Sequence, residues 1–304
     1  MLAQPSRVDA GHLQGAMPVD ACTRLLRELP RLVVLRWPVP LIYCPTAKAG
    51  TTTMSALLKS LLDGLPMHQH SPRPIVASSY IIRHGAKESL ANYTEVGRMD
   101  PSSAEAFCRR GAVSFTIARS PWTRLLSAYM GKVADDAHPG TARFSLAKMR
   151  EWYGLAGSAP VSFGQFVRWL RNNASDDNAH WRPHEQQCAP STHPYSLIGQ
   201  IETLDGDLLR LLRLLGLPER LATDEHISSA AKCRASERCA ASLRRQVGPD
   251  WASLQPTELL ARMYRSEPGT DLRSLVRRYY TADVRAHNYT FPSSRRRSVT
   301  RVSQ

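Results

Sequence analysis

The chain has 304 residues, of which 42% are hydrophobic, so it is long enough to bury a sizeable core and is not a disordered polypeptide. Forty Lys and Arg against 26 Asp and Glu give a formal net charge of +14, which favours an anionic partner, although a basic tail in a basic composition would give the same sum. No apolar run approaches the roughly 20 residues of a transmembrane helix, and no signal peptide is recognisable, so we expect a soluble protein or one whose anchor is missing from this chain.

Cysteine and asparagine usage bears on the compartment. Six scattered cysteines are too few to predict a disulfide scaffold; unpaired thiols and bridges, such as a small loop closed by Cys233 and Cys239, both stay open. Three of the five asparagines open N-x-S/T sequons, where Ser and Thr content alone would predict about one: Asn92, Asn173 and Asn288. This count favours a glycoprotein of the secretory pathway.

The two ends of the chain carry the weakest patterns. Residues 1–30 mix Pro, Gly and charge around a short helical pattern, and we interpret residues 1–37 as a loose N-terminal arm. Residues 291–304 are predicted to be a basic disordered tail, with three consecutive arginines and no core residues. A single main domain is therefore expected over residues 38–290.

The stretch from Leu41 to Leu65 predicts a strand, a loop and a helix. An apolar run beginning near Leu32 ends at Tyr43, and leucines then recur at helical spacing up to Leu65. Between them lies the sequence Lys48-Ala49-Gly50-Thr51-Thr52-Thr53. A flexible Gly, hydroxyl groups, the N–H groups and dipole of a starting helix, and a Lys charge together predict a phosphate site.

A second strand, loop and helix follows an irregular region over residues 66–110, in which a strand is possible at Ile75–Ile82. Val113 to Ile117 alternate as in a strand, Ser120 suits a helix N-cap and Pro121 suits the first helical position. Arg124 and Ser127 lie three residues apart on this helix. They share a face that can point toward a ligand; the alternative is a solvated Arg and a neutral Ser.

The remaining patterns complete an α/β arrangement. A helix is expected after Ser162, a strand over Tyr195–Ile201 and a Leu-rich helix over Asp205–Leu215. Two more helices are expected over Thr257–Tyr264 and Asp271–Tyr280. Alternating strands and helices predict a central, mostly parallel sheet flanked by helices.

The order of Lys48 and Gly50 identifies the kind of phosphate loop. An ATP-binding P-loop places Lys after its second Gly, whereas here Lys precedes Gly. The reversed order resembles the 5'-phosphosulfate loop of sulfotransferases, and Arg119-Ser120-Pro121-Trp122-Thr123-Arg124-Leu125-Leu126-Ser127-Ala128-Tyr129 is similar to their 3'-phosphate motif, R-x-P-x-x-R-L-x-S-A-Y.

A third stretch narrows the resemblance. His180-Trp181-Arg182-Pro183, Cys188-Ala189-Pro190 and the segment from Tyr195 to Leu204 resemble the W-x-P, C-x-P-C and Y-x-F-(I/V)-G-K-x-E-T-L segments of Golgi-type carbohydrate sulfotransferases. These are the enzymes of sulfotransferase family 2, typified by the chondroitin and dermatan 4-O-sulfotransferases. The chain departs from the family at Ala47, where Pro is usual, and this leaves the path of the loop open. It also has Ser191 where the second Cys is usual, and this leaves the role of Cys188 open.

The resemblance implies a P-loop-NTPase-like three-layer sandwich and a sulfotransferase domain over residues 38–290. It implies 3'-phosphoadenylyl sulfate (PAPS) as donor, 3'-phosphoadenosine 5'-phosphate (PAP) as product, and no metal. Residues Ala47 to Thr53 would hold the 5'-phosphosulfate, with Lys48 neutralising charge on the leaving oxygen. The implied 3'-phosphate residues are Arg119, Arg124 and Ser127.

The acceptor hydroxyl must lose a proton, so a general base is expected. Related enzymes place it between the two nucleotide motifs, which favours His84, with His180, His184 and Glu185 as alternatives. Trp181 and Arg182 are candidates for stacking on and pairing with an anionic or neutral glycan acceptor, and packing or surface roles are equally open.

Two other functions stay open. One is a sulfotransferase for a small alcohol, phenol or lipid, because loops outside the motifs decide the acceptor. The other is a non-enzymatic basic module that binds nucleic acid or acidic glycans through Arg295 to Arg297. The family would place the protein in the Golgi lumen, held by an anchor not visible here, and a cytoplasmic protein is the alternative.

Overall fold

The computed structural model describes residues 15–29, 32–35, 40–63, 93–95, 100–134, 142–173, 178–219 and 236–292. The chain divides into two compact units, each assembled from several segments. The first unit comprises residues 1–120, 179–228 and 285–287; the second comprises residues 121–178, 229–284 and 288–304.

The first unit is built on a five-stranded sheet with the strand order β3-β1-β2-β4-β5. Strand β4 pairs in parallel with β2 and with β5, whereas β1 is antiparallel to both β2 and β3. Four of the five strands therefore point the same way, and the predicted mostly parallel sheet is confirmed. The strands are Val33–Leu35 (β1), Leu41–Cys44 (β2), Tyr93–Glu95 (β3), Val113–Ala118 (β4) and Leu197–Gln200 (β5).

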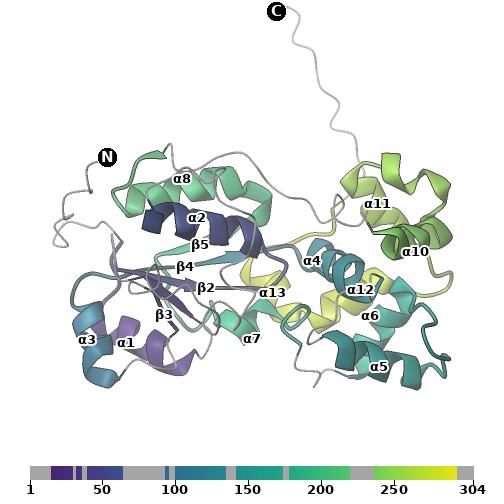
Figure 1. Ribbon diagram of the computed structural model, residues 1–304, viewed down its shortest axis with the longest axis horizontal. Coiled ribbons are helices and arrows are strands. Elements are labelled where there is room, and N and C mark those ends of the chain that lie inside the picture. Colours follow the sequence, from purple (N-terminus) through teal and green to yellow (C-terminus); the bar gives the residue numbers. More distant parts are fainter. Residues whose placement is uncertain are drawn as a thin grey trace, which may run out of the picture. The chain divides into compact units, whose positions relative to one another are not determined.

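Helices cover both faces of this sheet (Figure 1). Because side chains alternate between faces along a strand, Tyr43 and Phe115 point to one side, where their rings stack 4.6 Å apart, and Ile42 points to the other. The first side is covered by α2 (Thr51–Asp63) and α8 (Leu204–Leu214). The second is covered by α1 (Val19–Glu28) and α3 (Pro101–Cys108). The predicted three-layer α/β sandwich is thereby confirmed.

The apolar run from Leu32 to Tyr43 forms two strands and not one. In the first unit β1 and β2 run antiparallel, with Val33 opposite Tyr43 and Leu35 opposite Leu41. Both strands are buried on both faces, so neither shows the polar alternation that distinguishes separate strands in a sequence.

Two segments that the sequence pattern understated belong to the core of the first unit. Helix α1 lies in the range interpreted as a loose arm, yet Cys22 and Leu25 are fully buried. Helix α3 lies in the range interpreted as irregular. It begins with Asp100 as N-cap and Pro101 at the first helical position, a start signal that was present in the sequence.

Two disulfides tie distant parts of the first unit together, although the cysteine count predicted no scaffold. Cys22 in α1 bonds to Cys108 in α3, and Cys44 at the end of β2 bonds to Cys188 at the end of α7 (His184–Cys188). The open role of Cys188 is thus settled in this structure. Ser191, at the family's second Cys position, instead bonds through its hydroxyl and N–H to the Glu185 carboxylate.

The described part of the second unit is helical. Helix α4 (Pro121–Ala128) continues directly as a π-helix, Tyr129–Val133, and α6 (Phe163–Asn172) starts with the predicted Ser162 cap. Aromatic rings meet in its core, with Tyr129 against Phe163 at 5.3 Å. The other helices are α5 (Ala142–Trp152), α10 (Glu237–Val247), α11 (Pro256–Met263), α12 (Leu272–Tyr279) and α13 (Thr281–Ala286), whose last residues belong to the first unit.

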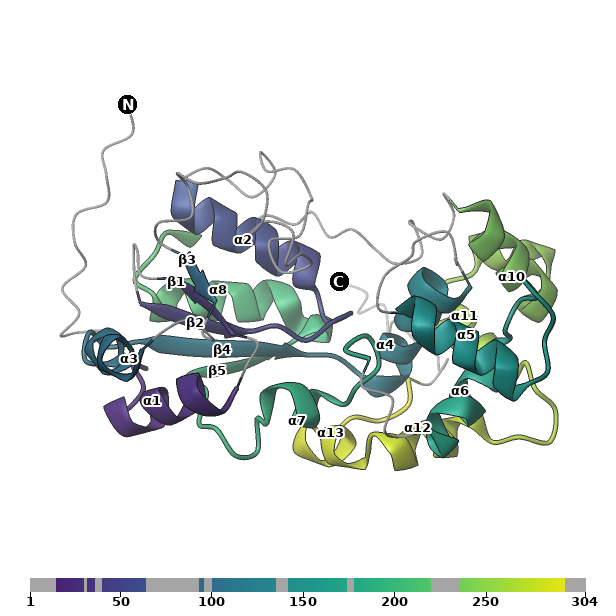
Figure 2. The ribbon, with the colours of Figure 1, turned by 60° about the horizontal axis from the view of Figure 1, so that its bottom comes forward.

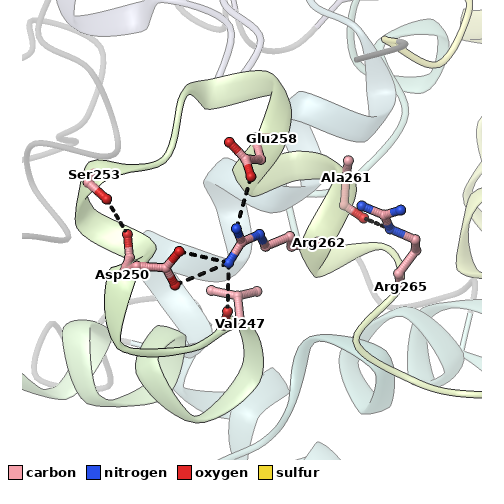
Figure 3. A network of polar contacts seen from close by, with 7 residues as sticks. All are labelled: Val247, Asp250, Ser253, Glu258, Ala261, Arg262 and Arg265. Carbon is pink, nitrogen blue, oxygen red and sulfur yellow. Dashed lines mark hydrogen bonds and ion pairs between the residues drawn. The ribbon is translucent and has the colours of Figure 1, made fainter. Parts of the chain in front are cut away.

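Arg262 holds the α10–α11 connection of the second unit together (Figure 3). Its guanidinium donates to the Val247 carbonyl oxygen at 3.3 Å, to both Asp250 carboxylate oxygens at 3.0 and 3.1 Å, and to Glu258 at 2.9 Å. These bonds raise the pKa of Arg262 further, so the side chain stays charged. The network includes the short 3-10 helix Pro249–Ser253 between α10 and α11.

Several predictions fall outside the described residues: the strand at Ile75–Ile82, the base candidate His84 and the arginines of the tail. Among the residues that the structure describes, no helix is both long and apolar enough to cross a membrane.

Candidate functional site

The candidate site lies where three parallel strands of the first unit end. Strands β2, β4 and β5 lie side by side (Figure 2), so their carboxyl ends meet at one edge of the sheet. The segments that leave this edge are 45–50 after β2, 119–120 after β4 and the 3-10 turn Ile201–Thr203 after β5. Ligands of open α/β sheets bind outside the carboxyl ends of the strands.

The loop after β2 has an unusual backbone. The Ala49 N–H donates to the Thr46 carbonyl oxygen at 3.1 Å and closes a tight turn. Lys48 has a φ of 66° and Gly50 a φ of 75°, so two nearby residues take the left-handed conformation. A lysine rarely adopts it, and such strain is stored mainly at functional sites. The turn leaves the Lys48 side chain partly exposed, as a phosphate site requires.

Gly50 joins this turn to the first turn of α2. The helix begins with a hydrogen bond from the Met54 N–H to the Gly50 carbonyl oxygen at 2.9 Å. The first N–H groups of a helix have no partner within it, so the N–H groups at Thr51 to Thr53 and the helix dipole favour an anion. The three Thr side chains are partly exposed.

We expect Gly50→Ala to weaken both the fold and anion binding. A Cβ at this position would lie 2.6 Å from Ile201 Cδ1, and the φ of 75° disfavours any L side chain. The expected loss is about 1–3 kcal/mol of unfolding free energy, measured by urea denaturation. Gly206→Ala is the matched control, since no atom lies within 4 Å of its Cβ position. Equal stability of the two variants would contradict the steric argument.

Arg119 connects the two predicted nucleotide motifs. One guanidinium nitrogen of Arg119, Nη1, donates to the carbonyl oxygen of Lys48 at 2.8 Å. Lys48 and Arg119 are 71 residues apart in the chain, and both were predicted site residues. A guanidinium has five N–H donors, so this bond can orient Arg119 while other donors serve an anion.

Glu202 was not predicted, yet it connects the ends of β4 and β5. Its Oε1 accepts from the Ser120 N–H at 2.9 Å. Behind it, Asp207 Oδ2 accepts from the Gln200 N–H at 2.8 Å and from the Thr203 hydroxyl at 2.7 Å. The resemblance places Glu202 in the E-T-L segment, but only the fold shows that its carboxylate holds the residue after Arg119.

The second unit carries Arg124 and Ser127, both buried. The Arg124 side chain is 1% exposed and pairs with Asp283, which is 2% exposed, at an N–O distance of 3.7 Å. Its guanidinium also lies over the Tyr280 ring, 5.9 Å from the centroid. The assignment of Arg124 to the nucleotide stays a prediction, and the structure adds a contact with Asp283 inside this unit.

His184 is held from both ring nitrogens. The Thr116 hydroxyl donates its one proton to the Cys44 carbonyl oxygen at 3.0 Å, so it accepts from His184 Nε2 at 2.9 Å. In the neutral ring Nδ1 is then an acceptor for His287 Nε2, 3.2 Å away. This chain of hydrogen bonds links α7 to β2 and β4.

The other predicted acceptor-site residues have mixed environments. Trp181 is fully buried, so of the two roles left open the structure favours packing over stacking on a sugar. His180 and Arg182 are partly exposed in the turn before α7, whereas the Glu185 carboxylate accepts two bonds from Ser191. Among the described residues, no group of three or more His, Cys, Asp or Glu is placed to hold a metal ion.

Comparison with known proteins finds relatives among the sulfotransferases. A model of the Sulfotransferase family matches residues 38–290. Human carbohydrate sulfotransferase 9 is 25% identical over 265 residues, which cover 83% of this chain and 52% of the relative. Rat carbohydrate sulfotransferase 10 is 24% identical over 204 residues, covering 58% of this chain and 50% of the relative. Zebrafish carbohydrate sulfotransferase 14 is 30% identical over 118 residues, covering 36% and 32%.

The matches therefore span about half or less of these relatives. No solved structure matches significantly. The family match covers most of the chain and includes the Lys48 loop, Arg119 and the segment around Glu202. The chain belongs to the Sulfotransferase family.

Proposed function

We propose that this protein transfers the sulfuryl group of PAPS to a hydroxyl of a carbohydrate acceptor. The observation that carries the proposal is the 2.8 Å bond from Arg119 to the Lys48 carbonyl oxygen. It joins the loop that resembles a 5'-phosphosulfate site to the arginine that opens the 3'-phosphate motif. PAPS carries both groups, whereas ATP and ADP lack the 3'-phosphate.

In the proposed donor site, residues Ala47 to Thr53 hold the 5'-phosphosulfate with backbone N–H groups and Thr hydroxyls. Lys48 neutralises the charge that grows on the oxygen between sulfur and phosphorus as PAP leaves. Arg119, Arg124 and Ser127 are assigned to the 3'-phosphate by their positions in the motif. Sulfuryl transfer resembles phosphoryl transfer in depending on positioning and charge stabilisation.

The bond from sulfur to the nucleotide oxygen breaks as the bond from sulfur to the acceptor oxygen forms, and the acceptor proton passes to a general base. His84 is the favoured base from its place between the two motifs, and it lies outside the described residues. His180 remains the alternative. Glu185 is less suited, because its carboxylate already accepts two hydrogen bonds from Ser191.

The carbohydrate class of the acceptor rests on the relatives, whose names describe carbohydrate sulfotransferases. Arg182 is partly exposed and is proposed to contact the acceptor. Trp181 is omitted from this surface because it is fully buried.

We also propose an oxidising compartment of the secretory pathway, such as the Golgi lumen. Disulfides persist in oxidising compartments, and the first unit contains two. Asn288, which opens one of the three N-x-S/T sequons, is exposed, as glycosylation requires. Alkylation of the natively expressed protein before and after reduction measures its disulfides. Free Cys44 and Cys188 thiols in the native protein would argue against this location.

Arg119→Ala is expected to remove the preference for a 3'-phosphate. A charge-assisted bond to phosphate contributes about 1.5–3 kcal/mol, so the affinity for PAP should fall roughly 10- to 100-fold more than the affinity for ADP, which loses only the support of the Lys48 loop. Titration calorimetry with both nucleotides measures the difference. Arg109→Ala, an exposed arginine on the α3 side, is the control. Equal affinity of the wild-type protein for PAP and ADP would refute the donor assignment.

A further inference from the structure

A cavity in the second unit is lined by residues of α6, of α12 and of the segment just before α12, and three of its eight lining residues are arginines. Its volume is about 320 Å³, near the lower end for small-ligand sites. On α6, Arg171 and Asn172 follow Arg168 by three and four residues, and on α12, Arg278 follows Leu275 by three, so each helix turns one face to the cavity. The lining residues are Arg168, Arg171, Asn172, Gly269, Thr270, Asp271, Leu275 and Arg278.

The charges around the cavity leave two cations for a ligand. Arg168 pairs with Glu267, so its charge is balanced within the protein. Asp271 is committed to the start of α12, where its carboxylate accepts from the Ser274 N–H at 3.2 Å and from the Ser274 hydroxyl at 2.6 Å. These bonds lower the pKa of Asp271. Arg171 and Arg278 are exposed, and among the described residues neither has a carboxylate within ion-pair distance.

The uncharged lining suits a sugar ring. Asn172 supplies an amide and Thr270 a hydroxyl for sugar hydroxyl groups, and the largely buried Leu275 supplies an apolar patch for a ring face. None of the lining residues is aromatic, so the cavity offers no platform for stacked bases of a single-stranded nucleic acid.

We propose that this cavity binds an acidic saccharide unit, whose carboxylate or sulfate ester lies between Arg171 and Arg278. This inference rests on the proposed function, since it takes the glycan acceptor to be anionic. Two guanidinium groups can hold an oxyanion with several charge-assisted hydrogen bonds. The site therefore recognises the negative charge of a saccharide more than the order of its sugar units. A carboxylate and a sulfate ester share this chemistry, and the experiment separates them.

The test measures binding of three probes to the full chain by titration calorimetry: a non-sulfated chondroitin hexasaccharide, its sulfated form, and a neutral maltohexaose. The variant Arg171→Gln/Arg278→Gln removes both cations. The matched control Arg244→Gln/Arg245→Gln removes two exposed arginines from α10, away from the lining. Because all four arginines are exposed, both variants are expected to keep the wild-type melting temperature.

The cavity variant is expected to lose roughly 10- to 100-fold in affinity for acidic probes, while the control loses much less. The better acidic probe identifies a carboxylate or a sulfate ester as the preferred group. Three results would each overturn the proposal. The two variants could lose the same affinity for the acidic probes, or maltohexaose could bind as tightly as those probes. A single-stranded DNA oligomer could also bind and depend on Arg171 and Arg278 as strongly as the acidic probes do. PAP binding by the same proteins separates this proposal from the proposed function. If only the cavity proposal is wrong, the proteins still bind PAP. If the donor-site assignment is wrong, they do not bind PAP.

Discussion

Replacement of Lys48 by alanine is expected to lower the rate constant of sulfuryl transfer by about 100- to 1000-fold, or about 2.7–4 kcal/mol of transition-state stabilisation. Lys48 is held in a left-handed conformation with a φ of 66°, and its carbonyl oxygen is fixed by Arg119. In the proposed mechanism, this fixed backbone carries the ammonium group at the 5'-phosphosulfate site. Removal of the side chain leaves these backbone contacts available and takes away the positive charge.

The kinetic pattern distinguishes this role from simple binding. If Lys48 acts on charge that grows as PAP leaves, kcat falls while the KM for PAPS changes less. Lys148→Ala, at an exposed position of α5, is the matched control and should retain activity. A Lys48→Ala protein with unchanged kcat and a raised KM would show that Lys48 only binds the donor.

Replacement of Asp283 by alanine is expected to lower the unfolding free energy by about 3–5 kcal/mol, because it leaves the Arg124 charge buried without its carboxylate. Both side chains are almost fully buried, and 3.7 Å separates their charged atoms. Urea denaturation measures the loss through the transition midpoint. A buried pair replaced on both sides loses far less, so Arg124→Leu/Asp283→Leu should recover most of the stability.

An exposed pair provides the comparison for this result. Glu105 and Arg109 form an ion pair on α3 with side chains 50% and 68% exposed, and Glu105→Ala should cost at most about 1 kcal/mol. If Asp283→Ala costs no more than Glu105→Ala, the Arg124 charge is not desolvated as the structure indicates. PAP binding by the double Leu variant tests the nucleotide role of Arg124: loss of binding would support that role, and retained binding would contradict it.

Local patterns predicted the fold class and the elements that carry the candidate site. The Lys48 loop and the strand before Arg119 carry their signals within a few residues, as turn glycines, apolar alternation and caps. The burial of Arg124 could not be read in this way. Its three-residue spacing from Ser127 fits a ligand-facing helix surface and a buried one equally well, and its partner Asp283 lies far away in the sequence.

The missed features depend on contacts between distant segments. The Cys44–Cys188 bond joins residues 144 apart, and the bond between Ser120 and Glu202 joins residues 82 apart, so neither leaves a local pattern. The antiparallel pairing of β1 with β2 was not predicted, because both strands are buried on both faces. Helix α3 is different, since Asp100-Pro101 is a recognisable helix start that the irregular surroundings obscured.

The most direct test of the proposed activity is transfer of a radiolabelled sulfuryl group from PAPS to a panel of glycans by the intact protein. The account predicts labelled glycan and PAP in equal amounts, with the label lost in the Lys48→Ala variant. Transfer to small alcohols or phenols but to no glycan would contradict the carbohydrate assignment. Absence of transfer to every acceptor, together with no binding of PAP by the folded protein, would contradict the enzyme assignment itself.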